Sequence, residues 1–548
     1  MPTLDFKGKQ YIYSHHHSVP FRELEIDEKK SLSAEGKKPN LDDNLIINGD
    51  NLHALKALMP QYAGKIKCIY IDPPYNTGNE GWCYNDNVNS PLMKEWLKKN
   101  ANPVDKEDLE RHDKWLCMMY PRLKLLHELL ADDGVVFVSI DDNEQHNLRT
   151  LMDEIWGEDN FISCIIWQNK VSPANDSKWF SEDHEYILVY AKKKDLWHPH
   201  RTQRTQEHDK YYKNPDADPR GSWNSSAYTC NKNKDERPNL YYAIINPNTG
   251  EEVWPNEKAV WAYSKETHEE NVRENLLYWG SDGKSKSPRR KQFLHEAKPV
   301  VPRSVWGFNE VGSTQQATYE IRQLFEEAPF TYPKVSTLLK KIFYHSTDKD
   351  SIILDSFAGS GTTAHAVLAL NKEDGGNRKF ICVEMEDYAD TITAERVRRV
   401  INGVPAAKDA SLKEGLGGSF TFCTLGKEIR IEKILTGESL PTYEALAKYV
   451  FYTATGKSLE GTVKERPDYF VGETDLYEVY LLYKPDIAFL RSNDSALNGE
   501  KLKAIAGRES KKEKLVFATA KYMGQKELSP QNITFCQLPY AIHKVVGA

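Results

Sequence analysis

The spacing of apolar residues along this 548-residue chain changes several times, and each change predicts a different element. Between residues 41 and 195, short runs of Ile, Val, Leu and Tyr alternate with segments in which Leu recurs every three or four positions. The runs are typical of buried strands and the recurring Leu of amphipathic helices. We predict strands near 45–48, 66–71, 135–140, 161–167 and 184–193, with helices around Leu52–Leu58 and Leu123–Leu130.

The same alternation returns after residue 330. The stretch YPKVSTLLKKIFYHST predicts an amphipathic helix, and a strand, a glycine turn, a helix, a strand and a further helix follow up to about residue 403. Strands that alternate with helices form a mostly parallel sheet with helices on both faces. The predicted fold class is therefore α/β.

Outside these two stretches the pattern changes, which predicts further domains. Residues 196–330 lose the alternation and are rich in Trp, Tyr, Asn, Pro, Lys and Arg, as expected of an inserted domain. Residues 1–40 are polar and predict an exposed N-terminal arm. Residues 406–548 contain short strand-like runs and one helix, which predicts a separate C-terminal α/β domain. The two halves of the alternating pattern, 41–195 and 331–405, would form one domain.

Composition excludes several classes of protein. With 39% hydrophobic and 28% charged residues the chain is of ordinary globular type, and it has no apolar window of the roughly 18 residues that a membrane span needs. The N-terminus has no secretory signal, so a cytoplasmic location is expected. The eight cysteines form no C-x-x-C pair and are expected to be reduced thiols. The run His15–His17 is interpreted as a local feature, and no metal is expected.

The net charge of −7 weakly opposes nucleic-acid binding by the chain as a whole, because phosphate contacts need clustered Lys and Arg. One local cluster stands out. Residues 281–303 carry seven basic and two acidic side chains, 7 − 2 = +5. This stretch is a candidate for contact with phosphates, and a solvated loop is an equally open interpretation.

The glycine turn of the second half predicts a nucleoside-binding unit. Asp355 ends a predicted strand, and Phe357, Gly359 and Gly361 then lead into a helix, where backbone N–H groups can approach a ligand closely. Glu384 stands 23 residues after Gly361, at the end of the next strand. A carboxylate in that position can bind two ribose hydroxyls.

Other interpretations of this turn are less consistent with its residues. A P-loop needs Lys after the last glycine, but Thr362 and Thr363 stand there. A dinucleotide site favours a third glycine at position 364, which is Ala. A turn that only joins strand to helix remains open on this motif alone.

A second motif, Asp72-Pro73-Pro74-Tyr75, follows the predicted strand 66–71. The carboxyl ends of parallel strands are where such sheets bind ligands. The exocyclic amine of adenine is a poor nucleophile because its lone pair is delocalised, and the Asp72 carboxylate with the Pro73 carbonyl can accept its two hydrogens. Tyr75 offers an aromatic face for the base, and the prolines restrict the backbone. A rigid turn without chemistry is the alternative.

Taken together, DPPYNTG and DSFAGSGTT resemble the amino-methyltransferases of DNA, and their order along the chain resembles the beta class. The resemblance covers most of residues 41–200 and 330–403. It implies a Rossmann-like, circularly permuted sheet of seven strands and S-adenosylmethionine as cofactor. It also implies double-stranded DNA as substrate, with methyl transfer to N6 of an adenine flipped out of the duplex. The insertion 196–330 would be the target-recognition domain.

The same resemblance assigns roles to further residues. Asp50 would lie near the adenine of the cofactor, and Lys334 would belong to a helix that closes over its methionine end. The cofactor set is completed by Asp355, Phe357, Gly359, Gly361, Thr362 and Glu384. The chain departs from the family pattern at Val335 and Ser356, where proline is usual.

The chain length, the YNTGNE and NPNTGEEVWP phrases and the tail resemble the modification (Mod) subunit of type III restriction-modification systems. That subunit acts as a homodimer and can partner a restriction subunit with helicase and nuclease parts. A solitary adenine methyltransferase fits nearly as well. An N4-cytosine enzyme more often has Ser in place of Asp72, a glutamine or RNA methyltransferase more usually has N-P-P-Y, and a non-enzymatic DNA-reading subunit would lack one of the two motifs.

Overall fold

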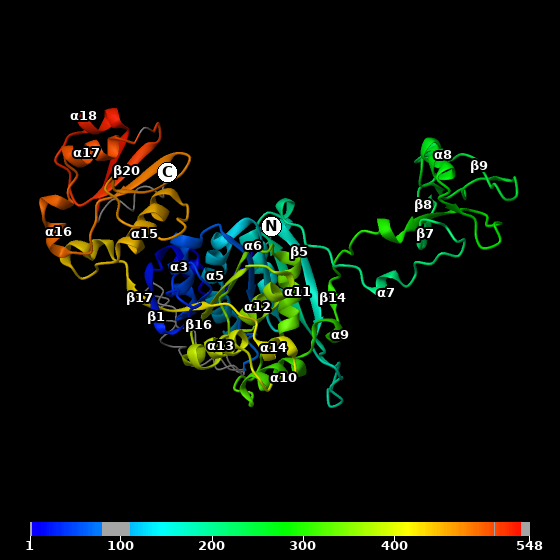
Figure 1. The fold of residues 1–548 in the computed structure, drawn as a ribbon, viewed down its shortest axis with the longest axis horizontal. Coiled ribbons are helices and arrows are strands. Elements are labelled where there is room, and N and C mark those ends of the chain that lie inside the picture. The colour runs from blue at the N-terminus through cyan, green and yellow to red at the C-terminus, as the bar shows by residue number, and fades with distance from the viewer. Residues whose placement is uncertain (1–2, 79–109, 509, 539–548) are drawn as a thin grey trace. The chain divides into compact units, whose positions relative to one another are not determined.

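The computed structural model describes residues 3–78, 110–508 and 510–538 (Figure 1). The chain divides into two compact units, one made of residues 1–200 and 303–548 and the other of residues 201–302. Among the described residues, no helix is both long and apolar enough to cross a membrane. The seven cysteines within the described ranges are all free thiols, as expected.

A ten-stranded sheet forms the centre of the first unit. Its order is β1 (Arg22–Leu32), β17 (Phe420–Glu428), β2 (Leu45–Asn48), β16 (Lys379–Glu384), β15 (Ile352–Asp355), β3 (Ile66–Ile71), β4 (Leu130–Ile140), β6 (His184–Ala191), β5 (Phe161–Gln168) and β14 (Val305–Trp306). The strands from β17 to β4 are mutually parallel, whereas β1 and β6 run antiparallel to their neighbours. The predicted mostly parallel α/β sheet is confirmed. It has ten strands instead of seven because β1, β17 and β14 extend it.

Helices cover both faces of this sheet, and each face has its own apolar core. Successive residues of β3 point to opposite faces, so that Ile69 and Ile71 enter one core while Cys68 and Tyr70 enter the other. The first core is completed by α3 (Asn51–Tyr62), α5 (Arg111–Leu129) and α6 (Gln145–Trp156). The second is completed by α10 (Thr314–Phe325), α11 (Ser336–Ser346), α12 (Thr362–Asp374) and α13 (Glu395–Asn402). Burial on both faces explains why five of the six residues of β3 are apolar.

The N-terminal segment folds onto this unit and is not the exposed arm that its polarity predicts. It forms α1 (Lys9–Ile12), α2 (His15–Ser18) and the edge strand β1, which pairs with β17. Phe6, Ile12 and Val19 are buried in the first core. Three apolar side chains at irregular spacing give no periodic signal, and charged residues are usual on an edge strand. The segment therefore looked like a solvated arm.

The second unit, residues 201–302, is a small domain built on aromatic side chains. It contains α7 (Gln206–Asp209), β7 (Trp223–Ala227), β8 (Thr229–Cys230), β9 (Ile244–Ile245), β10 (Glu252–Val253), β11 (Val260–Trp261), α8 (Lys265–Arg273), β12 (Leu277–Tyr278) and β13 (Arg289–Phe293). Tyr228, Tyr242, Trp261 and Trp279 form its core with Ile244. The unit is shorter than the insertion expected over 196–330. Residues 303–330 pack within the first unit instead, because β14 pairs with β5 and α10 buries Ile321 and Leu324.

The C-terminal part of the first unit has a sheet of its own. Its strands are β18 (Phe470–Glu473), β19 (Tyr477–Leu481), β20 (Glu513–Ala518) and β21 (Ile533–Gln537). The helices of this region are α15 (Tyr443–Thr455), α16 (Ile487–Arg491), α17 (Gly499–Ala506) and α18 (Gln525–Leu528). The run SFTFCTLG, expected in this tail, instead supplies β17 to the main sheet. It joins that sheet because Phe420 and Phe422 are buried in the second core.

One cation of the basic stretch 281–303 is structural. Lys291 has only 2% of its side chain exposed, and its Nζ lies 2.5 Å from Asp216 Oδ2 and 2.8 Å from Asp218 Oδ2. Lys284, Lys286, Arg289 and Lys298 are exposed. The stretch therefore offers fewer cations to a phosphate backbone than its sequence suggests.

We predict that Lys291→Ala lowers the free energy of opening of the 201–302 unit by about 2 kcal/mol, because Asp216 and Asp218 lose a charged hydrogen-bond donor while Arg220 still binds Asp218. Hydrogen exchange of the β7 and β13 amides in the full chain measures this free energy of opening. Lys286→Ala, at an exposed position, is the matched control and should change the value by about 0.5 kcal/mol or less. Equal exchange in the two variants would contradict a structural role for Lys291.

Candidate functional site

The two sequence motifs lie at the same edge of the main sheet. β16, β15 and β3 are adjacent and parallel, with Asp355 paired to Cys382 and Leu354 paired to Ile69. Asp72 follows β3, Asp355 ends β15 and Glu384 ends β16, so the three carboxylates stand at neighbouring carboxyl ends. The permuted chain therefore brings together segments that are nearly 300 residues apart in sequence.

Lys334 connects the two motifs. Its Nζ lies 2.9 Å from Asp72 Oδ2 and 3.3 Å from Glu185 Oε2, and it donates a hydrogen bond of 2.9 Å to the Tyr75 hydroxyl. The Tyr75 hydroxyl in turn donates to Glu185 Oε2 at 2.8 Å. On the other side, the Lys334 carbonyl accepts a hydrogen bond of 3.2 Å from Thr362 Oγ1. A single residue thus contacts the predicted catalytic tetrapeptide and the glycine turn.

Asp72 keeps one acceptor atom unused. Its Oδ2 is paired with Lys334, whereas Oδ1 is buried and has no hydrogen-bond partner among the described residues. The following backbone is held in place, since Trp115 Nε1 donates to the Pro74 carbonyl at 2.7 Å. Asn76 is fully buried at a φ of 60° and donates to the buried Glu144 carboxylate. A buried, unpaired carboxylate oxygen on a fixed loop is suited to accept a hydrogen from a ligand.

Burial dominates the electrostatics of this cluster. Desolvation raises the pKa of Asp72, while the Lys334 ammonium opposes the rise and Glu185 adds to it. Burial would lower the pKa of Lys334, but the carboxylates of Asp72 and Glu185 outweigh it and hold that pKa above its usual value. Burial also raises the pKa of Tyr75 well above its usual value, with Asp72 contributing. Lys334 therefore stays charged and Tyr75 stays neutral.

The glycine turn has a backbone conformation and close protein neighbours that favour glycine at both positions. Gly359 and Gly361 have φ values of 51° and 78°, which disfavour other residues. A side chain at 359 would come within 3.1 Å of the Phe330 ring, and one at 361 within 3.0 Å of the Thr393 carbonyl. Glu384 accepts hydrogen bonds from Gly359 N at 2.7 Å and from Glu386 N at 3.0 Å.

The remaining predicted cofactor residues surround this turn. Asp355 accepts from Phe357 N at 3.0 Å and from Thr363 Oγ1 at 2.5 Å, and burial raises its pKa to about 7. Phe357 packs partly buried against the first core. Asp50 caps α3 by accepting from His53 N at 3.1 Å, and its other oxygen lies 3.3 Å from Arg122 Nη2.

Three residues of the site were not anticipated from the sequence. Glu185 contacts Tyr75 and Lys334, and Asn169 Nδ2 donates to Glu185 Oε1 at 2.8 Å. The fully buried Arg396 donates to Thr362 Oγ1 at 2.7 Å. Glu185 lies at the start of β6 and Asn169 directly follows β5, two strands whose antiparallel pairing the sequence does not reveal. For Arg396, the only sequence signal is a cation on the otherwise apolar face of a helix.

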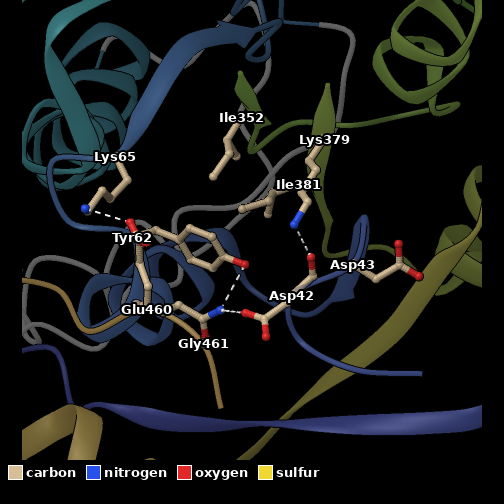
Figure 2. Close-up of a pocket in the computed structure, with 10 residues that line it drawn as sticks. Asp42, Asp43, Tyr62, Lys65, Ile352, Lys379, Ile381, Glu460 and Gly461 are labelled. Carbon is tan, nitrogen blue, oxygen red and sulfur yellow. Dashed lines mark hydrogen bonds and ion pairs between the residues drawn. The ribbon is translucent and has the colours of Figure 1, made fainter. Parts of the chain in front are cut away.

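Two other features do not fit a functional centre of this kind. His16, His17 and Glu128, which belong to neither motif, have ligand atoms within 4.8 Å of one another, with 3.7 Å between His16 Nε2 and Glu128 Oε1. A cavity of about 230 Å³ opens at the opposite edge of the sheet, where β15 and β16 begin (Figure 2). It is lined by Asp42, Tyr62 and Lys379, and the Lys379 ammonium donates to the Asp42 carbonyl at 2.5 Å.

Comparison with known sequences agrees with the two motifs. Residues 66–395 match the family described as DNA methylase (N6_N4_Mtase). The chain is 35% identical over 429 residues to the type III restriction-modification enzyme StyLTI Mod subunit of Salmonella typhimurium, covering 74% of this chain and 64% of that protein. It is 31% identical over 490 residues to the EcoPI Mod subunit of Escherichia phage P1, covering 80% of this chain and 74% of that protein. The chain thus spans about two thirds to three quarters of the length of these relatives.

Among solved structures, the chain is similar to the PvuII DNA methyltransferase, a cytosine-N4-specific enzyme. The identity is 13% and the TM-score 0.32, over 64% of this chain and 86% of that one.

We predict that the Asp355 carboxyl makes stability fall as the pH rises. Its pKa near 7 in the folded chain exceeds the unfolded value of about 4, so the folded state binds more protons between these pH values. The stabilising contribution is complete below about pH 4 and is lost as the pH rises through 7. Asp355→Asn should remove that part of the pH dependence, an effect of a few kcal/mol.

Urea unfolding of the full chain at pH 5 and pH 8 measures the difference between wild type and variant. Asp387→Asn, at an exposed position of the same region, is the control and should follow wild type. A wild-type profile for Asp355→Asn would show that the carboxyl is not protonated in the folded state.

Proposed function

This chain belongs to the DNA methylase family, and on that premise we propose that it transfers a methyl group to N6 of an adenine flipped out of duplex DNA. The observation that carries the proposal is the unpaired Asp72 oxygen, buried at the same sheet edge as the glycine turn. In duplex DNA the N6 atom lies inside the base stack, so the base must leave the helix to reach such an atom.

The arrangement supports distinct roles for the two oxygens of Asp72. Oδ2 is engaged by Lys334, so Oδ1 is the acceptor left for the amine of the base. The Pro73 carbonyl would accept the second amine hydrogen, which frees the nitrogen lone pair for attack. Tyr75, fixed through its hydroxyl by Glu185 and Lys334, would stack on the base. Stacking of this kind contributes about 1–3 kcal/mol per base.

The residues of the second motif fit S-adenosylmethionine, which when bound supplies an electrophilic methyl group on sulfur. Gly359 and Gly361 leave room for close backbone approach, and the buried Glu384 carboxylate can accept hydrogen bonds from ribose hydroxyls. Asp50, Asp355, Phe357, Thr362 and Lys334 complete the proposed pocket. Lys334 would orient Asp72 through its ion pair with Oδ2.

We further propose that the chain is the modification subunit of a type III restriction-modification system, because two curated relatives bear that name. It would then act as a homodimer, with a helicase-nuclease restriction subunit as partner and a cytoplasmic location. The 201–302 unit would read the target sequence, while its exposed cations such as Lys284 and Arg289 would contact phosphates. Asp72 in place of Ser favours adenine over cytosine, and a solitary methyltransferase remains the second candidate.

We expect Asp72→Ala to abolish methyl transfer while leaving cofactor binding nearly unchanged, because Asp72 would contact the base and not the cofactor. Transfer of labelled methyl groups to DNA and calorimetric titration with S-adenosylmethionine measure the two properties. Asp159→Ala, at an exposed position, is the control. Single-molecule sequencing of DNA from expressing cells identifies the modified base. Full activity of Asp72→Ala would refute the catalytic assignment.

We expect Glu185→Ala to lower kcat by about 10- to 100-fold with a smaller change in KM, since Tyr75 and Lys334 lose the carboxylate that positions them. Glu185→Gln keeps an oxygen acceptor for the Tyr75 hydroxyl and should restore part of the rate. Steady-state kinetics of these variants, beside the exposed control Glu158→Ala, make the measurement. A wild-type kcat in Glu185→Ala would rule out the positioning role.

A further inference from the structure

A loop that the proposed function does not use leaves the sheet at the catalytic edge. This β5–β6 loop, residues 169–183, joins two antiparallel strands whose last pair is Gln168 with His184. Tyr186 of β6 pairs with both Ile166 of β5 and Ile140 at the carboxyl end of β4. The loop therefore emerges at the carboxyl end of β4, beside the end of β3 from which Asp72 follows (Figure 1).

The tip of the β5–β6 loop presents two large aromatic side chains to solvent. Trp179 is 82% exposed and Phe180 is 94% exposed. The loop has internal hydrogen bonds that define its course, from Ala174 N to Ser181 Oγ at 2.8 Å and from Ser177 N to the Ala174 carbonyl at 3.2 Å. The rings are therefore exposed on a folded loop.

Such exposure is unfavourable unless a partner covers the rings. Burying one side chain of this size contributes about 1.5–3 kcal/mol, and adjacent exposed aromatics commonly mark an interaction site. Lys178 lies next to them, with its Nζ 5.2 Å from the centre of the Trp179 ring. Aromatic faces beside a cation are the combination that binds stacked bases and their phosphates.

The loop is also joined to the proposed catalytic cluster. Asn169 N donates to the Asp183 carbonyl at 3.0 Å at the base of the loop, and Asn169 Nδ2 donates to Glu185 Oε1. Phe180 is five residues from Glu185, a span of at most about 18 Å. The aromatic tip therefore stays within a few base pairs of any base held at Asp72.

We infer that Trp179 and Phe180 insert into the DNA base stack beside the target and hold the flipped state, an inference that rests on the proposed function. Apolar side chains that insert between base steps are an established way to unstack a duplex. Stacking on the aromatic rings would replace the stacking that the neighbouring bases lose when the adenine leaves. The loop thus contributes to the flipping equilibrium and not to the methyl transfer itself.

The test uses the full chain and a duplex that contains the sequence methylated by wild type, with 2-aminopurine at the target position. The fluorescence of 2-aminopurine rises when it leaves the stack. The double variant Trp179→Ala/Phe180→Ala should reduce the flipped population, and methyl transfer to the matched adenine duplex, by about tenfold or more. That factor corresponds to 1.4 kcal/mol of lost stacking. Tyr522→Ala, which removes an exposed aromatic of the C-terminal sheet region, is the control.

A duplex with an abasic site opposite the target adenine distinguishes a defect in base flipping from a defect in methyl transfer or self-association. Flipping is easier there, so the double variant should recover most of the wild-type rate. Wild-type flipping and transfer on the matched duplex would overturn the inference. So would an equal loss on both duplexes accompanied by loss of self-association in sedimentation, since a second copy of the chain would then cover the rings. Absence of transfer by wild type to any DNA would instead overturn the proposed function on which the inference rests.

Discussion

The ion pair between Lys334 and Asp72 is the interaction on which the geometry of the site depends. It joins segments about 260 residues apart and lies where little water can compensate either charge. One ammonium group faces two carboxylates and a hydroxyl, so loss of the ammonium would leave Asp72 Oδ2 without its cation, whereas loss of one carboxylate leaves Lys334 paired with the other. The Lys334 carbonyl also accepts from Thr362 Oγ1, so the backbone of the same residue contacts the glycine turn.

The second unit separates the two halves of the main sheet in sequence. The site geometry is kept because the chain on both sides of this insertion is held by the first unit. The second unit leaves after His200 and returns at Arg303. His200 N donates to the His345 carbonyl at 2.8 Å, and β14 pairs with β5 directly after the return. Both ends of the insertion are thus fixed to the first unit. Its own aromatic core means that its sequence can change without disturbing the strands that carry Asp72 and Glu384.

Much of this arrangement could be predicted from sequence, because the relevant signals are local. Strands such as 66–71 are buried on both faces, so apolar residues occupy nearly every position, and the glycines at 359 and 361 mark the required turn directly. Glu185 could not be found in this way, since its role depends on the register between antiparallel strands. Lys291 resembled a phosphate contact because its two carboxylate partners lie more than seventy positions earlier in the chain. The YNTGNE phrase is only partly described, as Asn79 and Glu80 lie outside the described residues.

Helix α3 connects the C-terminal region to the site. Helix α3 carries Asp50 at its amino end, while its carboxyl end meets the segment that follows α15. Leu459 N donates to the Pro60 carbonyl at 3.0 Å, and Ser458 Oγ donates to the Ala63 carbonyl at 2.9 Å. Lys448 of α15 adds a hydrogen bond of 3.0 Å to Gln61 Oε1. Carbonyls in the last turn of a helix lack partners within it, so these contacts satisfy acceptors that would otherwise need water. The C-terminal region therefore helps to fix the helix that positions Asp50, although its own sheet lies outside the site.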